Sequence, residues 1–355
     1  MSARTGFVDR VSYVADRNAA RLVGRRIAPT VPALPPTLHT YIRRLTEAAA
    51  CACAPWIGRG DKHAADAAAV DAMRRSFSDV PFRGRVVIGE GEKDDAPYLA
   101  PGEQLGPDAA SDVEVAVDPL DGTRLAAEGE AGALSVLALA PPGSFLPLGR
   151  AFYMEKLVGP AAAAELSLDA SPGAVVAAVA EALRVPPAEL RIAVQQRPRH
   201  RTLVRELRRS GARVHLFADG DLSYALLALE GRTAASDTPV DLLRGIGGAP
   251  EGMLAAAPQR VLGGAMHARL APRSPAERRR LEDAPGAAGC LDRILTAADL
   301  VRTDAVAMAL TGVTDGPLLR GVRRDPAQEG ALVTETLLLG AHASPRRVVA
   351  PHTPA

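Results

Sequence analysis

The chain has 355 residues, of which 47% are hydrophobic and 23% are charged, as in a globular protein with a large core. Its 42 basic and 41 acidic residues nearly cancel, which argues against nucleic acid or an anionic membrane as a partner. The sequence shows no signal peptide and no apolar run near the ~20 residues that span a bilayer, so we expect a cytoplasmic protein. Its three cysteines lack the spacing of a disulfide framework, and we expect them to be reduced.

The first part of the chain falls into two segments. Residues 1–38 are rich in Arg and end in a Pro-rich stretch, which predicts a flexible N-terminal appendage. Residues 39–185 form a predicted α+β half that carries acidic motifs. An Ala-rich helix is expected at 65–77, and alternating or apolar runs predict strands at 85–88, 113–117 and 133–139.

Residues 186–345 form a predicted α/β half in which strands and helices alternate. Strands are expected at 192–194, 214–217 and 240–243, with helices at 202–210, at 222–229 and from 251. A glycine turn is expected after the third strand, and a surface helix or loop at 272–289. This alternation predicts an α/β fold with a parallel sheet and helices packed on its faces.

The strongest chemical signal is Asp-Pro-Leu-Asp-Gly-Thr at 118–123, directly after a predicted strand. Two carboxylates as close as Asp118 and Asp121 repel each other unless a cation lies between them, and such oxygen ligands suit Mg²⁺ or Mn²⁺. Gly122 and Thr123 offer N–H groups to a phosphate near a helix start, and the Thr123 hydroxyl can position a water molecule. The alternative is an Asx turn followed by a helix cap, as in many α/β proteins.

Two more acidic clusters lie upstream. Gly-Glu-Gly-Glu at 89–92 follows an apolar strand, and its carboxylates need water, a cation or a basic partner. Gly-Arg-Gly-Asp-Lys at 58–62 precedes Asp66 at the beginning of the Ala-rich helix. A solvated loop explains the first cluster equally well, and an ordinary first-turn charge explains Asp66.

Three loops in the second half follow successive predicted strands. They are Arg-Pro-Arg-His at 197–200, Asp-Gly-Asp at 219–221 and Gly-Ile-Gly-Gly-Ala-Pro-Glu-Gly at 245–252. Ligands of open α/β sheets bind outside the carboxyl ends of the strands, so Arg199 and His200 can hold a phosphate and Glu251 can reach a metal. The glycine motif lacks the third glycine of a dinucleotide fingerprint, which disfavours a nucleotide cofactor.

These motifs occur in the same order in the class II (GlpX-type) fructose-1,6-bisphosphatases, which the chain resembles over residues 50–342. Tyr-Met-Glu-Lys at 153–156, Thr-Gly-Val-Thr at 311–314 and Thr-Glu-Thr-Leu-Leu at 334–338 extend the resemblance. The resemblance implies a layered α-β-α-β-α sugar-phosphatase fold, related to lithium-sensitive phosphatases such as the inositol monophosphatases. It also implies a homo-oligomer.

The resemblance further implies metal-dependent hydrolysis of the 1-phosphate of a sugar bisphosphate, fructose 1,6-bisphosphate, in gluconeogenesis. The implied metal ligands, for Mg²⁺ or Mn²⁺, are Asp66, Glu90, Asp118, Asp121 and Glu251. We expect a catalytic role for Thr123, Asp118 and Asp61. The implied substrate contacts are Asp121, Gly122, Thr123, Tyr153, Pro198, Arg199, His200, Asp219, Gly220, Asp221 and Gly248.

The sequence departs from the family pattern at a few positions. Asp121 stands where class II enzymes usually have Glu, and Met-His-Ala-Arg at 266–269 replaces Met-Asn-Gly-Arg. These changes leave three alternatives open: the same chemistry on sedoheptulose 1,7-bisphosphate, on another sugar or inositol phosphate, or a non-catalytic sugar-phosphate-binding paralogue.

Overall fold

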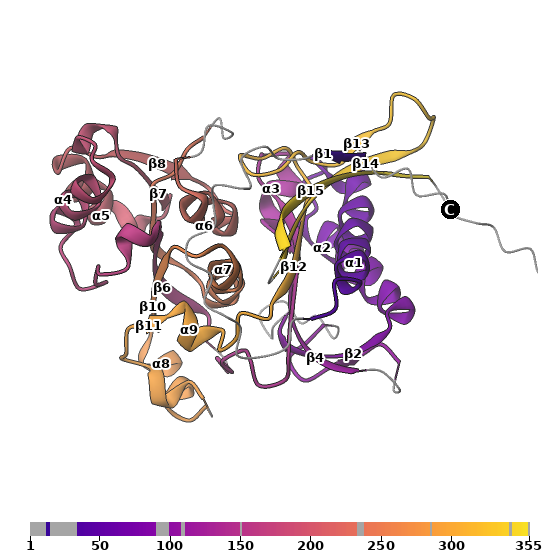
Figure 1. The fold of residues 1–355 in the computed structure, drawn as a ribbon, viewed down its shortest axis with the longest axis horizontal. Coiled ribbons are helices and arrows are strands. Elements are labelled where there is room, and N and C mark those ends of the chain that lie inside the picture. Colours follow the sequence, from indigo (N-terminus) through magenta and orange to yellow (C-terminus); the bar gives the residue numbers. More distant parts are fainter. Residues whose placement is uncertain are drawn as a thin grey trace, which may run out of the picture.

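The computed structural model describes residues 34–89, 99–107, 111–149, 151–232, 238–284, 286–340 and 343–353, with the backbone of 12–14. Two mixed sheets and the helices around them form five layers, helix–sheet–helix–sheet–helix, stacked from left to right in Figure 1. The expected α-β-α-β-α fold is therefore confirmed. No helix in the described part of the chain has the length and apolar character needed to cross a membrane.

The larger sheet contains nine strands within the described residues. Its order is β1-β15-β14-β12-β5-β4-β2-β3, with β13 beside β14, and only β2 and β4 pair in parallel. The strands are β1 (Ser12–Val14), β2 (Phe82–Ile88), β3 (Gln104–Leu105), β4 (Ser111–Asp121), β5 (Leu134–Ala140), β12 (Ala307–Gly312), β13 (Arg323–Arg324), β14 (Leu332–Gly340) and β15 (Ala343–His352).

The smaller sheet contains six strands within the same residues, in the order β11-β10-β6-β9-β7-β8. Strands β8, β7 and β9 are parallel to one another, and the remaining pairs are antiparallel. The strands are β6 (Tyr153–Gly159), β7 (Arg191–Gln195), β8 (Arg213–Phe217), β9 (Leu242–Gly248), β10 (Ala265–Leu270) and β11 (Leu295–Thr296). The predicted parallel sheet thus covers only the β8-β7-β9 part.

Helices cover both sheets. Helices α1 (Leu38–Cys53) and α2 (Lys62–Ser76) pack on the outer face of the nine-stranded sheet, and α4 (Pro172–Leu183) and α5 (Arg201–Arg209) on that of the six-stranded sheet. Helices α6 (Asp221–Glu230) and α7 (Ala249–Leu262) lie between the sheets. Apart from its two polar ends, α6 is a run of buried apolar and small residues because both of its sides face a sheet or α7. The shorter helices are α3 (Thr123–Glu128), α8 (Pro275–Glu282) and α9 (Ala297–Leu300).

Two local predictions were wrong, both at the candidate site. Strand β4 does not end in a loop after Val117 but continues to Asp121, with a break in its register between Asp118 and Asp121. The expected glycine turn at 245–248 is part of β9, which continues to Gly248 and passes directly into α7. In both places the glycine and proline residues that indicate a turn lie where a strand ends and a helix begins.

The remaining expected elements lie where the periodicity put them, and the 272–289 segment contains α8. Most of the 1–38 appendage lies outside the described residues, apart from β1, which pairs with β15. Tyr153 already belongs to the six-stranded sheet, so that sheet draws on residues before 186. The division of the chain at residues 38 and 185 stays a prediction.

Candidate active site

The 118–123 motif connects the end of β4 to the short helix α3. The Asx turn considered from sequence is present, because Asp118 Oδ1 accepts a hydrogen bond from the Leu120 N–H at 3.1 Å. Gly122 adopts φ 81°, a left-handed conformation that glycine tolerates best, and α3 begins at Thr123. The motif therefore turns the chain sharply and leaves Asp118 and Asp121 at one end of the sheet.

Asp121 is the most unusual carboxylate of the described residues. Its side chain is buried, with 5% of the residue exposed, and no described group forms a hydrogen bond with its Oδ2 atom. Burial raises the pKa of the Asp121 carboxyl well above its usual value, and the nearby carboxylates of Asp221, Glu251 and Asp219 raise it further. The Lys156 ammonium group opposes this shift.

Three separate elements bring these carboxylates together. Asp121 ends β4, Asp219 and Asp221 flank the start of α6, and Glu251 lies in the first turn of α7. A Cβ atom built on Gly220 would lie 4.0 Å from Asp121 Oδ2, so the α6 start contacts the β4 end directly. The site therefore lies between the two sheets, where the N-termini of α6 and α7 approach β4.

Glycines on β9 allow this close approach. A Cβ atom on Gly248 would collide with the Glu251 carboxylate, and one on Gly247 would collide with Asp221 and lie 2.9 Å from Lys156 Nζ. Lys156 Nζ donates to Asp221 Oδ2 and, at 2.9 Å, to the Gly248 carbonyl oxygen. Because Lys156 is only 2% exposed, this bridge from β6 fixes the α6 and α7 starts relative to each other.

The donor set fits a hard divalent cation. Four carboxylates converge against one ammonium group, and one carboxylate oxygen is buried without a hydrogen bond, an arrangement that a bound cation would neutralise. Within the described ranges, no three His, Cys, Asp or Glu side chains are already close enough to hold an ion. The predicted ligand Glu90 lies outside the described residues.

Asp61 directly precedes α2, and Asp66 lies in its first turns. Asp61 caps that helix, since its Oδ1 accepts from the Ala64 N–H at 3.0 Å. The loop before it is tied to α3 by bonds from the Gly58 and Gly60 N–H groups to the Ala126 and Ala127 carbonyl oxygens. These bonds place the start of α2 beside the helix that begins at Thr123. Asp66 is half-buried; burial raises the pKa of the neighbouring Cys53, and the charge of Asp66 raises it further.

A second cluster is basic and aromatic. The Arg199 Cζ lies 5.6 Å and the Arg273 Cζ 5.1 Å from the centre of the Tyr153 ring. Arg199 is oriented by bonds to the Ile246 carbonyl oxygen (3.0 and 2.6 Å) and to Gln195 Oε1 (2.9 Å). Tyr153 pairs with Gly248 across β6 and β9, so this cluster adjoins the acidic one. Two guanidinium groups around one ring form an anion-binding surface.

His200 has a different role from the expected phosphate contact. Its Nδ1 pairs with the Gln195 carbonyl oxygen at 2.7 Å, and its Nε2 accepts from the Ile246 N–H at 2.8 Å. Both ring nitrogens are thus used to join β7 to β9, and burial lowers the pKa of the imidazole so that it stays neutral. We therefore omit His200 from the groups proposed to hold substrate; the neighbouring Pro198 is exposed.

Sequence reasoning missed three residues of this region as functional candidates. Lys156 was visible within a family motif, and a lysine directly before the apolar residues Leu157 and Val158 of a strand calls for a buried acidic partner. Gln195, which donates to Asp219 Oδ1 at 3.1 Å, and Arg273 carried no such signal. Arg273 follows β10 by three residues, and only the pairing of β10 with β6 brings it to Tyr153.

Fold and site together define a layered α/β protein with an acidic, ligand-binding centre between its two sheets. Residues 36–352 match the family described as bacterial fructose-1,6-bisphosphatase, glpX-encoded. The chain is 41% identical over 322 residues to fructose-1,6-bisphosphatase 1 class 2 of Escherichia coli K12, covering 87% of this chain and 93% of that protein. The same values hold for a fructose-1,6-bisphosphatase class 2 of Shigella flexneri. The chain belongs to this family of phosphatases.

Proposed function

We propose that this enzyme hydrolyses the phosphate ester at C1 of fructose 1,6-bisphosphate, giving fructose 6-phosphate and phosphate. The names of its relatives support this substrate. The observation that carries the proposal is the buried Asp121 carboxylate, which lies without a hydrogen bond to Oδ2 among three other carboxylates of the described chain. A purely structural site would not keep such mutual repulsion without a cation.

Mg²⁺ or Mn²⁺ is the proposed cofactor. Asp118, Asp121 and Glu251 are its proposed ligands at the site described above, and the family resemblance adds Asp66 and Glu90. Such a cation neutralises a phosphate dianion and lowers the pKa of a water molecule bound to it.

The chain's own groups orient the substrate in this proposal. The Thr123 hydroxyl, at the start of α3, positions the attacking water, and Asp61 beside α3 remains a catalytic candidate from the resemblance. Asp219 and Asp221 accept sugar hydroxyls at the start of α6. Lys156 keeps that start in place by bonding both Asp221 and the Gly248 carbonyl oxygen.

Arg199, Arg273 and Tyr153 are proposed to hold the second phosphate, the one that is not hydrolysed. Guanidinium groups bind phosphate oxygens through paired N–H donors, and both of these groups lie near the same ring. A bisphosphate then contacts both clusters, which fixes the reacting phosphate in one position.

Sedoheptulose 1,7-bisphosphate is the second candidate substrate. The Met-His-Ala-Arg segment that departs from the family pattern lies on β10, and β10 pairs with β6 up to Met154. Strand β10 therefore ends near Tyr153 and Arg273, and contacts there would distinguish a six-carbon from a seven-carbon bisphosphate. The place of the enzyme in gluconeogenesis, its cytoplasmic location and its homo-oligomeric assembly stay predictions.

The test is phosphate release from a panel of sugar phosphates with Mg²⁺, Mn²⁺ or EDTA, for wild type and Asp118→Asn. We expect metal-dependent release from fructose 1,6-bisphosphate above all others, abolished by the substitution. Faster release from the seven-carbon bisphosphate would favour the second candidate. Tight binding of a sugar bisphosphate without release from any substrate would replace both with a non-catalytic binding role.

A further inference from the structure

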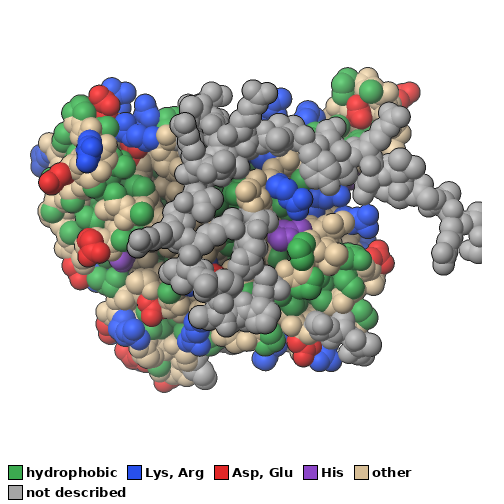
Figure 2. Space-filling model, in the orientation of Figure 1, with side chains coloured by type: hydrophobic (Ala, Val, Ile, Leu, Met, Phe, Trp, Pro, Cys, Tyr) green, Lys and Arg blue, Asp and Glu red, His purple; other side chains and the backbone are tan. Residues whose placement is uncertain are grey.

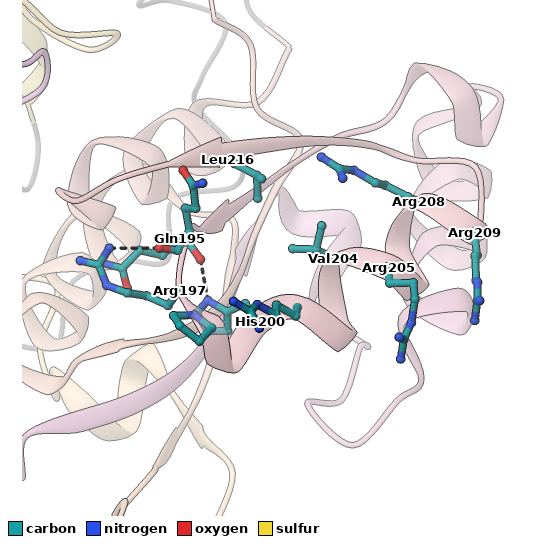
Figure 3. Close-up of a pocket in the computed structure, with 11 residues that line it drawn as sticks. Gln195, Arg197, His200, Val204, Arg205, Arg208, Arg209 and Leu216 are labelled. Atoms are coloured by element: carbon teal, nitrogen blue, oxygen red, sulfur yellow. Dashed lines mark hydrogen bonds between the residues drawn. The ribbon is translucent and has the colours of Figure 1, made fainter.

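A groove of about 830 Å³ lies outside the acidic site, between α5 and the edge of the six-stranded sheet (Figure 3). Strand β8 is the last strand of that sheet, and Leu216 on β8 faces Val204 on α5 across the groove. The end of the groove is formed by residues 195–198 and by His200, which lie at the end of β7 and directly after it. A volume of this size is typical of sites for small molecules.

The groove is strongly basic. Its lining includes Arg197, Arg201, Arg205, Arg208 and Arg209 and no acidic side chain. Figure 2 shows basic side chains grouped along the upper-left edge of the molecule, over the end where Figure 1 places α4, α5 and β8. The whole chain has a net charge of only +1, so this concentration of charge is local.

The four α5 arginines are all exposed. Within the described part of the chain, none of them forms a side-chain hydrogen bond or an ion pair. Arg278, also on a surface helix, pairs with both Glu282 and Asp292, and Arg269 pairs with Glu155 and Asp169. The exposed α5 guanidinium groups thus keep their donors available.

The spacing of these arginines works against the helix itself. Arg201, Arg205 and Arg208 lie on one face at intervals of four and three residues, where like charges destabilise a helix by about 0.2–0.5 kcal/mol per pair. Arg201 also stands in the first turn, where the helix dipole disfavours a positive charge. A bound polyanion would remove both costs.

The side chains that line the groove indicate which kind of ligand it binds. Planar guanidinium groups favour phosphate oxygens, and several of them along one groove favour a ligand with more than one phosphate. Val204, Leu216 and Pro198 add an apolar surface for a sugar or base. We propose that the groove between α5 and β8 binds a small molecule carrying two or more phosphates, and that its binding weakens substrate binding at the neighbouring site.

Arg197 connects the groove to the site. Arg197 lines the groove, and its guanidinium group, which Figure 3 shows directed away from α5, donates to the Ala218 carbonyl oxygen at 2.6 Å and approaches Asp219 Oδ1 at 3.4 Å. A phosphate in the groove competes with Asp219 and Ala218 for this guanidinium group. Losing those contacts loosens residues 218–221. Their role in holding the sugar is part of the proposed function, so the regulatory effect rests on that proposal. The effect on substrate affinity and the effect on effector affinity must then be equal.

The binding half is tested by calorimetry in EDTA with pyrophosphate and ATP as probes. We expect Arg205→Gln/Arg208→Gln to bind either probe on the order of tenfold more weakly than wild type. The matched control is Arg323→Gln/Arg324→Gln, which removes the same charge from exposed β13 and should leave affinity unchanged. Equal affinity in wild type and the α5 variant, or no binding to wild type, would overturn the proposal.

The regulatory half is tested by kinetics at fixed free Mg²⁺. Pyrophosphate should raise the KM for fructose 1,6-bisphosphate in wild type and in the β13 control but not in the α5 variant. The same rise in all three proteins would show that pyrophosphate competes at the substrate site, and would overturn the regulatory role. If no sugar phosphate is hydrolysed, the proposed function fails while calorimetry still decides whether the groove binds phosphates.

Discussion

Replacing Asp121 by Asn should stabilise the metal-free protein while abolishing its activity. The substitution keeps the shape of a buried side chain but removes its charge from beside Asp219, Asp221 and Glu251. Like charges several Å apart in a protein repel by a few kcal/mol, whereas the Asn amide still lacks a partner for a buried polar atom, so the net gain should be on the order of 1–3 kcal/mol. For a chain of this length the gain corresponds to roughly 1–4 °C in Tm.

The gain should depend on pH in a defined direction. Because the pKa of Asp121 is raised in the folded protein, that state holds its proton at pH values where the unfolded chain has lost it. Wild-type stability therefore falls as pH rises from the ordinary carboxyl pKa to the raised value, and stays lower above it. The advantage of Asp121→Asn should be absent at acidic pH and largest at alkaline pH.

The assay is thermal unfolding in EDTA across this pH range, repeated with Mn²⁺, together with phosphate release. Added Mn²⁺ should raise the Tm of wild type more than that of the variant, because the variant loses a proposed ligand. Asp241→Asn is the matched control: Asp241 is also buried, but it accepts from Arg232 at 2.6 Å and from the Arg191 N–H at 2.8 Å. Breaking that pair should cost about 1–3 kcal/mol, since Asp241 is buried but Arg232 is reached by solvent. If both variants lose stability equally in EDTA, the carboxylates around Asp121 do not repel one another and the reasoning is refuted.

Three further outcomes follow from single contacts. Gly248→Ala should abolish phosphate release by displacing the carboxylate that packs on it, whereas Gly289→Ala, with open space around its Cβ, should be silent in the same assay. Arg273→Ala should raise the KM for a bisphosphate about tenfold or more but leave hydrolysis of p-nitrophenyl phosphate unchanged. Arg280→Ala, which removes a similar stack on Phe152, should change neither the KM for the bisphosphate nor the hydrolysis of p-nitrophenyl phosphate. An equal effect of both variants would contradict the assignment of Arg273 to the second phosphate. Burial raises the pKa of Cys53 to about 12, so only about one molecule in ten thousand carries its thiolate at pH 8. Iodoacetamide should leave Cys53 unlabelled in native protein and label it in urea, as read by mass spectrometry.

Much of the fold was readable from local patterns. The Ala-rich helix α2, the apolar strands β4 and β5 and the alternating elements from β7 to α6 all carry periodicities that depend on neighbouring residues only. The strands and helices that were missed or misread carry conflicting local signals. Strand β9 ends in Gly-Ile-Gly-Gly, which indicates a turn in isolation but forms a strand because Asp221, Lys156 and Glu251 occupy the space beside it.

The candidate site divides in the same way. The sequence by itself determined that acidic and basic motifs follow strands at 118–123, 197–200, 219–221 and 245–252. Residues that directly follow a strand lie at an end of the sheet, where ligands bind in α/β folds. Only the tertiary structure decided which of them meet. The approach of Asp121 to Asp221, the bridge from Lys156 to Gly248, the use of both His200 nitrogens by the backbone and the position of Arg273 at Tyr153 all join residues on different strands and helices. These contacts depend on how two sheets pack around α6 and α7, a geometry that no local spacing of residues specifies.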